Sequence, residues 1–165
     1  MRTQNKTSQL QLRVSPAQKA ALQKRARTCG MSTSAWVLAK LLPSKQQEFQ
    51  DLVNRLAHTD QPSFELAALN DFLAGLDGNE IAEVLMERPR AQLSPLPANQ
   101  VAAMVEHVAY LRGVPVPGWV NQVEPLQEPY FATKLVSLRL HLLVNSPLAF
   151  RRRNLYVDAT VGDRV

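Results

Sequence analysis

Polar and apolar residues alternate near the start of the chain. Between Ser8 and Val14, every second position carries an apolar side chain. A period of two is typical of a β-strand with one buried face. Because a lone short strand is not stable in water, we expect it to pair antiparallel with the same strand of a second chain. The other face of the strand would carry Gln9, Gln11 and Arg13.

The pattern then changes and predicts a first helix. Ser15 can cap this helix, Pro16 fits its first turn, and Gly30 suits the position just after its end. We expect the thiol of Cys29 to be buried in a helix–helix core. The narrow apolar stripe of the helix consists of Leu22, Ala26 and Cys29.

A second helix is predicted directly afterwards. Ser32 or Thr33 can cap it, residues 35–42 carry it, and Pro43 ends it. Ala35 stands where an acidic residue often follows the cap, so no capping box is available. The N-terminus of this helix therefore has no negative side chain close to it.

Residues 44–112 predict a small bundle of short helices. Apolar side chains recur at helical spacing in residues 44–59, in a segment that opens at Pro62, in residues 79–87 and in residues 98–112. Prolines at positions 89, 95 and 97 indicate an interrupted connector before the last helix. The acidic residues of this region form a solvated face or contact a basic partner.

The C-terminal segment predicts extended stretches around one ambiguous element. Residues 113–119 are typical of an extended linker that ends in Trp119. Residues 135–144 fit a strand by alternation and a helix by the spacing of their leucines, and we favour the helix. Residues 154–158 could form a short strand.

Two groups in this segment are candidate partner-binding residues. Trp119, Tyr130 and Phe131 are of the kind that anchors protein interfaces, although core packing explains them equally well. The triplet Arg151, Arg152 and Arg153 would suit phosphate or carboxylate recognition. The alternative is a surface patch in which one arginine is paired internally.

Charge is distributed unevenly along the 165 residues. Residues 1–47 contain nine Lys or Arg and no Asp or Glu, whereas residues 48–150 contain six basic and twelve acidic residues. A long segment without a carboxylate indicates a polyanionic partner. Charge alone leaves DNA, RNA and a membrane surface open.

The strand, the Ser-Pro helix start and the turn from Cys29 to Ser34 together resemble the ribbon–helix–helix family of Arc/MetJ type. The resemblance covers about residues 8–43. In that family two paired strands enter the major groove of DNA. The resemblance implies that Gln9, Gln11 and Arg13 contact base edges, and Gln and Arg have suitable hydrogen-bonding patterns for adenine and guanine.

The same resemblance implies phosphate contacts at the N-terminus of the second helix. The backbone amides around Ser32, Thr33 and Ser34 would bind a phosphate with the help of the helix dipole. Lys24 and Arg25 are further candidate phosphate contacts.

A second resemblance rests on residues near the other end. It is carried by Glu106-His107, by the stretch from Arg112 to Trp119, by Glu128-Pro129-Tyr130-Phe131 and by the stretch from Ser146 to Asn154. Over about residues 98–165 the chain is similar to small bacterial proteins that resemble antitoxins paired with nucleotidyltransferase-like toxins. This resemblance implies that the region recognises a protein.

The sequence predicts no enzyme, no metal and no cofactor. The three histidines lack metal-site spacing, and no glycine-rich phosphate loop or hydrolase elbow is present. A single cysteine excludes an internal disulfide framework. No apolar run reaches about 18 residues and residues 1–9 are polar, so we expect a cytoplasmic protein without a membrane span.

Together these patterns predict a mainly α-helical protein. Residues 1–43 would form a ribbon–helix–helix domain that intertwines in a homodimer, and residues 44–165 a helical extension with an irregular proline-rich end. The expected function is an antitoxin that represses its own operon at a palindromic operator on double-stranded DNA and neutralises a protein toxin through the extension. The alternatives are an extension that serves oligomerisation or ligand sensing, and an RNA-binding or structural adaptor.

Overall fold

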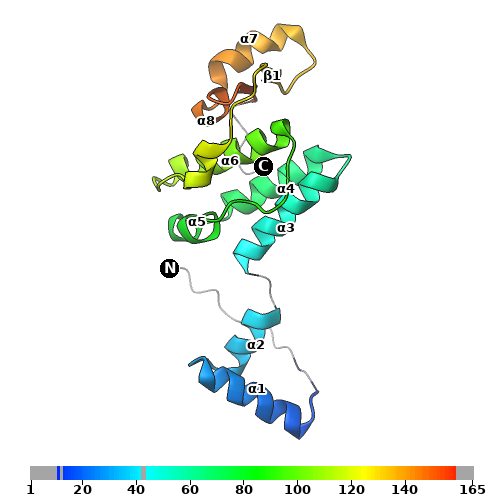
Figure 1. Ribbon diagram of the computed structural model, residues 1–165, viewed down its shortest axis with the longest axis vertical. Coiled ribbons are helices and arrows are strands. Elements are labelled where there is room, and N and C mark those ends of the chain that lie inside the picture. The colour runs from blue at the N-terminus through cyan, green and yellow to red at the C-terminus, as the bar shows by residue number, and fades with distance from the viewer. Residues whose placement is uncertain (1–10, 12, 42–43, 159–165) are drawn as a thin grey trace. The chain divides into compact units, whose positions relative to one another are not determined.

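The computed structural model describes residues 11, 13–41 and 44–158. The chain divides into two compact units, Met1–Pro43 and Ser44–Val165, called unit 1 and unit 2 below. In unit 1, α1 (Pro16–Thr28) packs against α2 (Thr33–Leu41) (Figure 1). The elements of unit 2 are α3 (Lys45–His58), α4 (Pro62–Ala74), α5 (Gly78–Val84), α6 (Pro95–Leu111), η1 (Gly118–Gln122), β1 (Tyr130–Phe131), α7 (Val136–Asn145), α8 (Leu148–Arg151) and β2 (Leu155–Tyr156).

Most of the strand expected between Ser8 and Val14 lies outside the described residues. Gln11, Arg13 and Val14 are described, and they are exposed and belong to no strand. The expected pairing needs the same strand of a second chain, so the ribbon stays a prediction.

Unit 1 has very little core of its own. Among its residues whose side chains are described, only Ala26 is buried. Leu22 is half-buried, and the expectation that Cys29 is buried is wrong, since its side chain is exposed. Cys29 is the C-cap of α1, where the chain leaves the helix, and its position no longer continues the apolar stripe.

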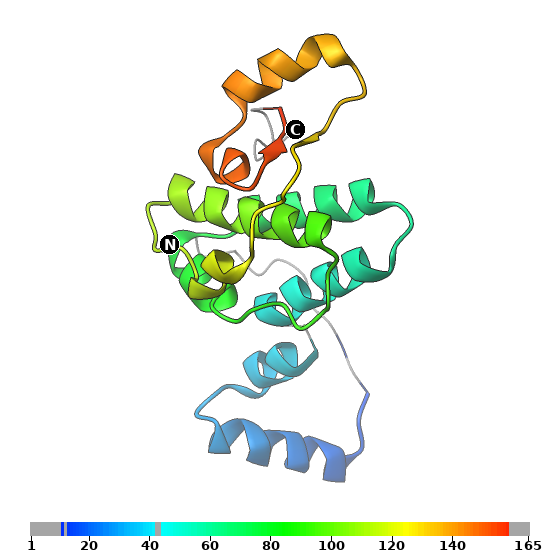
Figure 2. The same ribbon diagram turned by 45° about the horizontal axis from the view of Figure 1, so that its top comes forward.

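Unit 2 has a continuous apolar core. The helices α3 and α4 form a hairpin, α5 packs on α3, and α6 packs on α4 and α8 (Figures 1 and 2). The helix predicted for residues 44–59 is confirmed, with Ser44 as its N-cap, and so is the helix start at Pro62. The expected apolar face of α3 is buried and consists of Phe49, Leu52, Val53 and Leu56.

The start of α6 differs from the sequence prediction. The helix begins at Pro95 rather than at Ala98, and Pro97 also lies in its first turn. Proline is tolerated there because the first amides of a helix have no intrahelical acceptor. Two of the three prolines assigned to a connector therefore belong to the helix.

The C-terminal part of unit 2 contains a short parallel strand pair, β1 and β2. Tyr130 pairs with Leu155 and Phe131 with Tyr156. The strand predicted near residues 154–158 is confirmed, as is the helix favoured for residues 135–144, whereas β1 was not expected. In both views α7 lies at the end of unit 2 remote from α3 and α5 (Figures 1 and 2).

Candidate nucleic-acid interface

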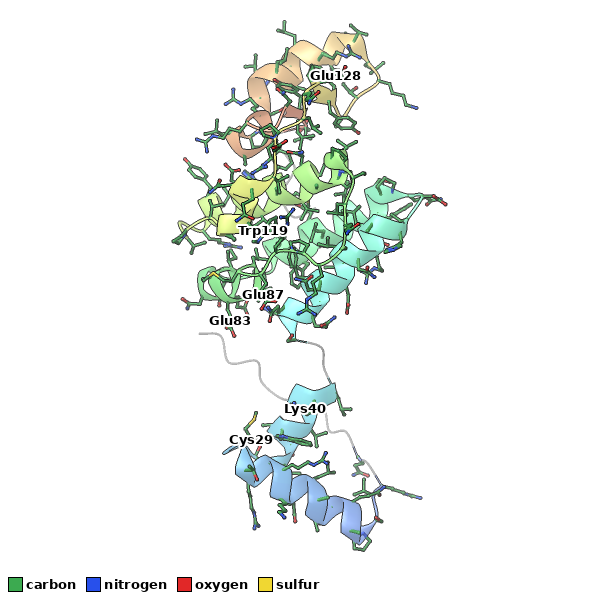
Figure 3. The ribbon with its side chains drawn as sticks, in the orientation of Figure 1. Cys29, Lys40, Glu83, Glu87, Trp119 and Glu128 are labelled. Carbon is green, nitrogen blue, oxygen red and sulfur yellow. The ribbon has the colours of Figure 1, made fainter. Side chains whose placement is uncertain are left out.

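The described part of unit 1 presents a basic surface without carboxylates. All six of its lysine and arginine side chains are exposed. They are Arg13, Lys19, Lys24, Arg25, Arg27 and Lys40; Figure 3 labels Lys40 together with Cys29. Because no Asp or Glu occurs before Glu48, no side chain of unit 1 can neutralise these charges.

The first helix begins at a complete capping box. The Ser15 Oγ accepts the backbone N–H of Gln18 at 3.3 Å, and the Gln18 Oε1 accepts the N–H of Ser15 at 2.9 Å. Pro16 occupies the first turn. This confirms Ser15 as the predicted cap, so α1 begins directly after it and Arg13 lies ahead of the helix.

The turn between the two helices has the geometry of a Schellman motif. Gly30 has a φ of 65°, the N–H of Met31 donates to Ala26 O at 3.0 Å, and the N–H of Gly30 donates to Arg27 O at 3.0 Å. Glycine adopts this left-handed conformation without the strain that a Cβ would add. The predicted position of Gly30 just after the helix is confirmed.

Ser32 is the residue that caps α2. Its Oγ accepts the N–H of Ala35 at 3.2 Å, and its carbonyl accepts the N–H of Trp36 at 2.9 Å. The amides of Thr33 and Ser34, at the first two helical positions, have no intrahelical acceptor. With no carboxylate nearby, this helix end has the chemistry that binds an anion.

The structure places the sequence-predicted contacts as follows. Gln9 lies outside the described residues, while Gln11 and Arg13 are exposed ahead of α1. Lys24 and Arg25 are exposed on α1, and Ser32 and Ser34 are exposed at the start of α2, where Thr33 is half-buried. None of those that the structure describes is buried, and the contacts of all of them with nucleic acid stay predictions.

In unit 2, Trp119 belongs to the core. It is buried, and its Nε1 donates to Leu85 O at 2.9 Å (Figure 3). Of the two interpretations open for this residue, the structure therefore supports core packing. Tyr130 and Phe131 are half-buried in β1, where the Phe131 ring stacks on Tyr156 with centroids 4.9 Å apart.

The arginine triplet divides into three different environments. Arg153 is buried and pairs with Glu106, Arg152 pairs with the same carboxylate at 3.2 Å from an exposed position, and Arg151 is exposed. The alternative from the sequence was a surface patch with one internally paired arginine. The structure instead pairs two of the three arginines, Arg152 and Arg153, with Glu106. The sequence gives no local signal for this, because Glu106 lies on another helix.

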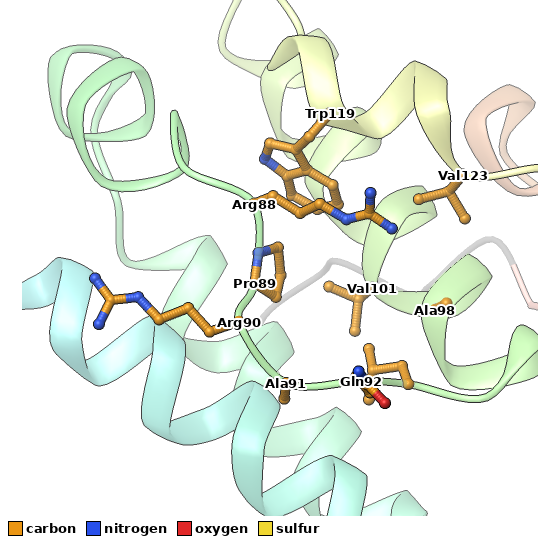
Figure 4. Close-up of a pocket in the computed structure, with 10 residues that line it drawn as sticks. Arg88, Pro89, Arg90, Ala91, Gln92, Ala98, Val101, Trp119 and Val123 are labelled. Carbon is orange, nitrogen blue, oxygen red and sulfur yellow. The ribbon is translucent and has the colours of Figure 1, made fainter.

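Unit 2 also has an open cavity of about 400 Å³ beside Trp119. The side chain of Arg88 extends along Trp119, and Val101 and Val123 form the apolar wall (Figure 4). Gln50 holds the segment around Arg88 and Arg90 in place, since its Oε1 accepts the N–H of Arg90 at 2.9 Å.

In the described part of the chain, no group of three His, Cys, Asp or Glu side chains could hold a metal ion. Among the helices described, none is both long and apolar enough to cross a bilayer.

Comparison with known protein families gives a match near the start of the chain. Residues 4–60 match the NikA-like family, which is described as mobilization protein NikA. The matched range is roughly a third of the 165 residues and includes both helices of unit 1 together with α3. The match supports an N-terminal domain of ribbon–helix–helix type. No curated protein matches the chain significantly. No solved structure does so either.

Proposed function

We propose that this chain is a DNA-binding protein that reads duplex DNA as a homodimer through unit 1. The observation that carries the proposal is the match of residues 4–60 to the NikA-like family. That range includes a unit with no carboxylate, exposed basic side chains and a capped helix end suited to a phosphate. The basic side chains and the helix end carry positive charge or partial positive charge, which attracts the phosphates of a DNA backbone.

The small core of unit 1 supports the dimer. Among its described side chains unit 1 buries only Ala26, and a segment of this size with so small a core needs a further interface to fold stably. Antiparallel pairing of residues 8–14 with a second chain would supply the missing interface. Val14, Met31, Leu38 and Leu41 are exposed in the single chain, and a dimer would cover apolar side chains of this kind.

In the proposed complex the two parts of unit 1 have different roles. Gln9, Gln11 and Arg13 of both chains would contact base edges in the major groove. The N-terminus of α2, with Lys24 and Arg25, would contact phosphates and hold the ribbon in register. The matched family, mobilization protein NikA, suggests that the DNA is a site used in mobilization. The other DNA target that we propose to test is the chain's own promoter, which the chain would repress.

The second candidate function concerns unit 2 and is that of an antitoxin. Its C-terminal part would bind and neutralise a protein toxin encoded beside it. The observation that favours a protein partner is the row of exposed apolar side chains on α7, which includes Val136 and Leu140. The resemblance of residues 98–165 to antitoxins points in the same direction.

The DNA-binding proposal is tested by titration of the full-length chain against labelled duplexes. The duplexes are its own upstream region, a candidate mobilization site and a scrambled sequence, each at two salt concentrations. A preference of about 1000-fold or more for one natural duplex would establish sequence-specific binding. Equal affinity for all three, lost steeply with salt, would reduce unit 1 to a general polyanion-binding segment.

A further inference from the structure

The helix α7 is apolar on two opposite faces, and unit 2 buries a side chain on one of them, where Leu142 is covered and Leu138 stays 44% exposed. Leu142 points into unit 2 and is 5% exposed. The outward face carries four large apolar side chains at positions i, i+4, i+7 and i+8, a spacing that forms one stripe along a helix. They are Val136, Leu140, Leu143 and Val144, which are 72%, 72%, 39% and 66% exposed.

This outward stripe is presented by a fixed helix. At one end Phe131 pairs with Tyr156 of β2; at the other the Ser146 Oγ accepts the N–H of Val157 at 2.8 Å. The Ser146 Oγ also lies 2.6 Å from Leu142 O, which ties the last turn of α7 to the same point. Since the helix is already ordered, a partner would bind the stripe at little cost in conformational entropy.

The surroundings of the stripe are basic. Residues 129–150 contain two basic residues, Lys134 and Arg139, and no Asp or Glu. Lys134 and Arg139 are exposed, and Arg139 borders the stripe because it lies three positions after Val136 and four before Leu143. The Arg139 guanidinium lies over the Phe131 ring, 5.1 Å from its centroid, which holds the charge beside the stripe.

We propose that the outward face of α7 docks into an apolar groove of another protein whose rim carries Asp or Glu carboxylates. The inference rests on the second candidate function and adds the surface and the chemistry of its partner. Apolar contact would cover Val136, Leu140 and Val144, and the rim would pair with Arg139 and Lys134. Electrostatic complementarity of this kind selects the partner as well as binding it.

Charge and shape argue against other occupants. A second copy of α7 would bring Arg139 and Lys134 of both chains together without any carboxylate in residues 129–157 to separate them. A nucleic acid offers phosphates but no apolar groove for four aliphatic side chains. An anionic bilayer suits longer helices with a strongly basic polar face, whereas α7 has ten residues and its other border carries Ser137 and His141.

The test is photocrosslinking in the native host with the full-length chain. The crosslinker p-benzoylphenylalanine is incorporated in place of Leu140, and in a matched strain in place of Phe64, which is equally exposed at 72% but lies on α4. Crosslinked peptides are identified by mass spectrometry. We expect position 140 to give a peptide of another protein that combines apolar residues with Asp or Glu, and position 64 not to give it.

A second variant tests the charge. Arg139→Glu in the crosslinking chain should reduce the yield at least about tenfold, since it places like charges at the rim. Arg88→Glu, a reversal at an exposed arginine elsewhere in unit 2, should leave the yield unchanged. Circular dichroism of each purified variant should show the melting temperature of the parent, because all substituted side chains are exposed.

Three other outcomes overturn the proposal. A crosslink to a second copy of the chain, or flotation with phosphatidylserine vesicles that Leu140→Glu abolishes, would assign the stripe to self-association or to lipid. Equal yields at positions 140 and 64 would mean that no partner recognises the stripe.

The docking surface and the antitoxin function can fail separately. A crosslinked partner that is not encoded beside the chain would refute the antitoxin function but not the docking surface. The DNA titration decides the role of unit 1 independently of both.

Discussion

The guanidinium of Arg153 donates from Nη2 to the Glu106 carboxylate at 3.3 Å, across 47 positions of the sequence. The same group donates from Nη1 to Val123 O at 3.1 Å and from Nη2 to Val120 O at 2.9 Å. One buried side chain thus connects α6, the η1 region and the segment that leads into β2. Its charge is paired with that of Glu106, which is itself largely buried.

Removal of this carboxylate should therefore destabilise unit 2 strongly. We expect Glu106→Ala to lower the free energy of unfolding by about 3–5 kcal/mol, because it leaves a buried positive charge without a partner. Arg152→Ala removes only the exposed pair with Glu106 and should cost about 0–1 kcal/mol. Urea unfolding of the full chain followed by circular dichroism measures both. An equally small loss of unfolding free energy in both variants would contradict this prediction, since it would show that the carbonyls of Val120 and Val123 are sufficient partners for Arg153.

A second prediction concerns the indole of Trp119. Trp119→Phe keeps an aromatic ring but leaves Leu85 O, buried inside the unit, without its donor. We expect a loss of about 1–3 kcal/mol in the free energy of unfolding. Tyr110→Phe, at an exposed position, serves as the control and should change stability by less than about 0.5 kcal/mol. A similar loss in both variants would contradict a specific role for the indole hydrogen bond.

A third prediction is a pH dependence at the start of α5. The hydrogen bond from Lys45 Nζ at 2.6 Å lowers the pKa of Glu80 below its usual value of 4.5, with help from the N–H of Asp77. A lowered pKa means that the folded state prefers the carboxylate, so this stabilisation is present above pH 4.5 and is lost as the pH falls through the lowered pKa. Glu80→Gln keeps the acceptor for Asp77 and removes the ion pair.

The expected difference between the parent and Glu80→Gln is small because the pair is partly exposed. It should reach at most about 1 kcal/mol near neutral pH and disappear in acid. Thermal unfolding of both proteins over a pH series measures it. A difference that stays constant down to strongly acidic pH would exclude the ion pair as its cause.

A fourth prediction isolates the turn of unit 1. A Cβ added at Gly30 or at Gly118 meets no atom within 4 Å, and of these two glycines Gly30 is the one with a positive φ. Gly30→Ala should therefore cost about 1–2 kcal/mol through backbone strain, while Gly118→Ala should not. Amide hydrogen exchange resolved to each unit would locate the loss in unit 1. Equal protection of unit 1 in both variants would contradict the strain argument.

A fifth prediction separates base contacts from phosphate contacts. Arg13→Ala should cost about 1–3 kcal/mol on the preferred duplex and relax specificity there, whereas Lys24→Ala should weaken all duplexes alike and reduce the salt dependence. Titration of the full-length variants against preferred and scrambled duplexes measures both effects. A uniform loss for Arg13→Ala would assign Arg13 to phosphate.

Local signals in the sequence predicted the helix starts well. Ser15 followed by Pro16, and Pro62, each mark a start that the structure confirms, because these signals depend on neighbouring residues only. The helix predicted for residues 44–59 rested on the spacing of its apolar side chains, and Ser44 is its N-cap. The turn at Gly30 was predictable for the same reason. At Pro95 the sequence suggested a connector, since a proline in a first turn and a proline in a loop have the same local context.

Features that depend on distant residues could not be predicted. The pairing of Arg153 with Glu106 and that of β1 with β2 join segments that no periodicity connects. The helix favoured for residues 135–144 was placed by Leu135, Leu138 and Leu142, which left its outward stripe unnoticed. An apolar pattern on two faces of a helix gives no indication of which face the protein itself covers.

The attachment of α7 has an evolutionary consequence. The segment from Ala132 to Ser146 leaves and rejoins unit 2 at two consecutive residues: Tyr156, which ends β2, and Val157, which follows it. Substitutions on its outward stripe therefore leave the bundle of α3 to α6 unchanged. Related chains could exchange this short insert and acquire new binding preferences while they keep one inherited scaffold.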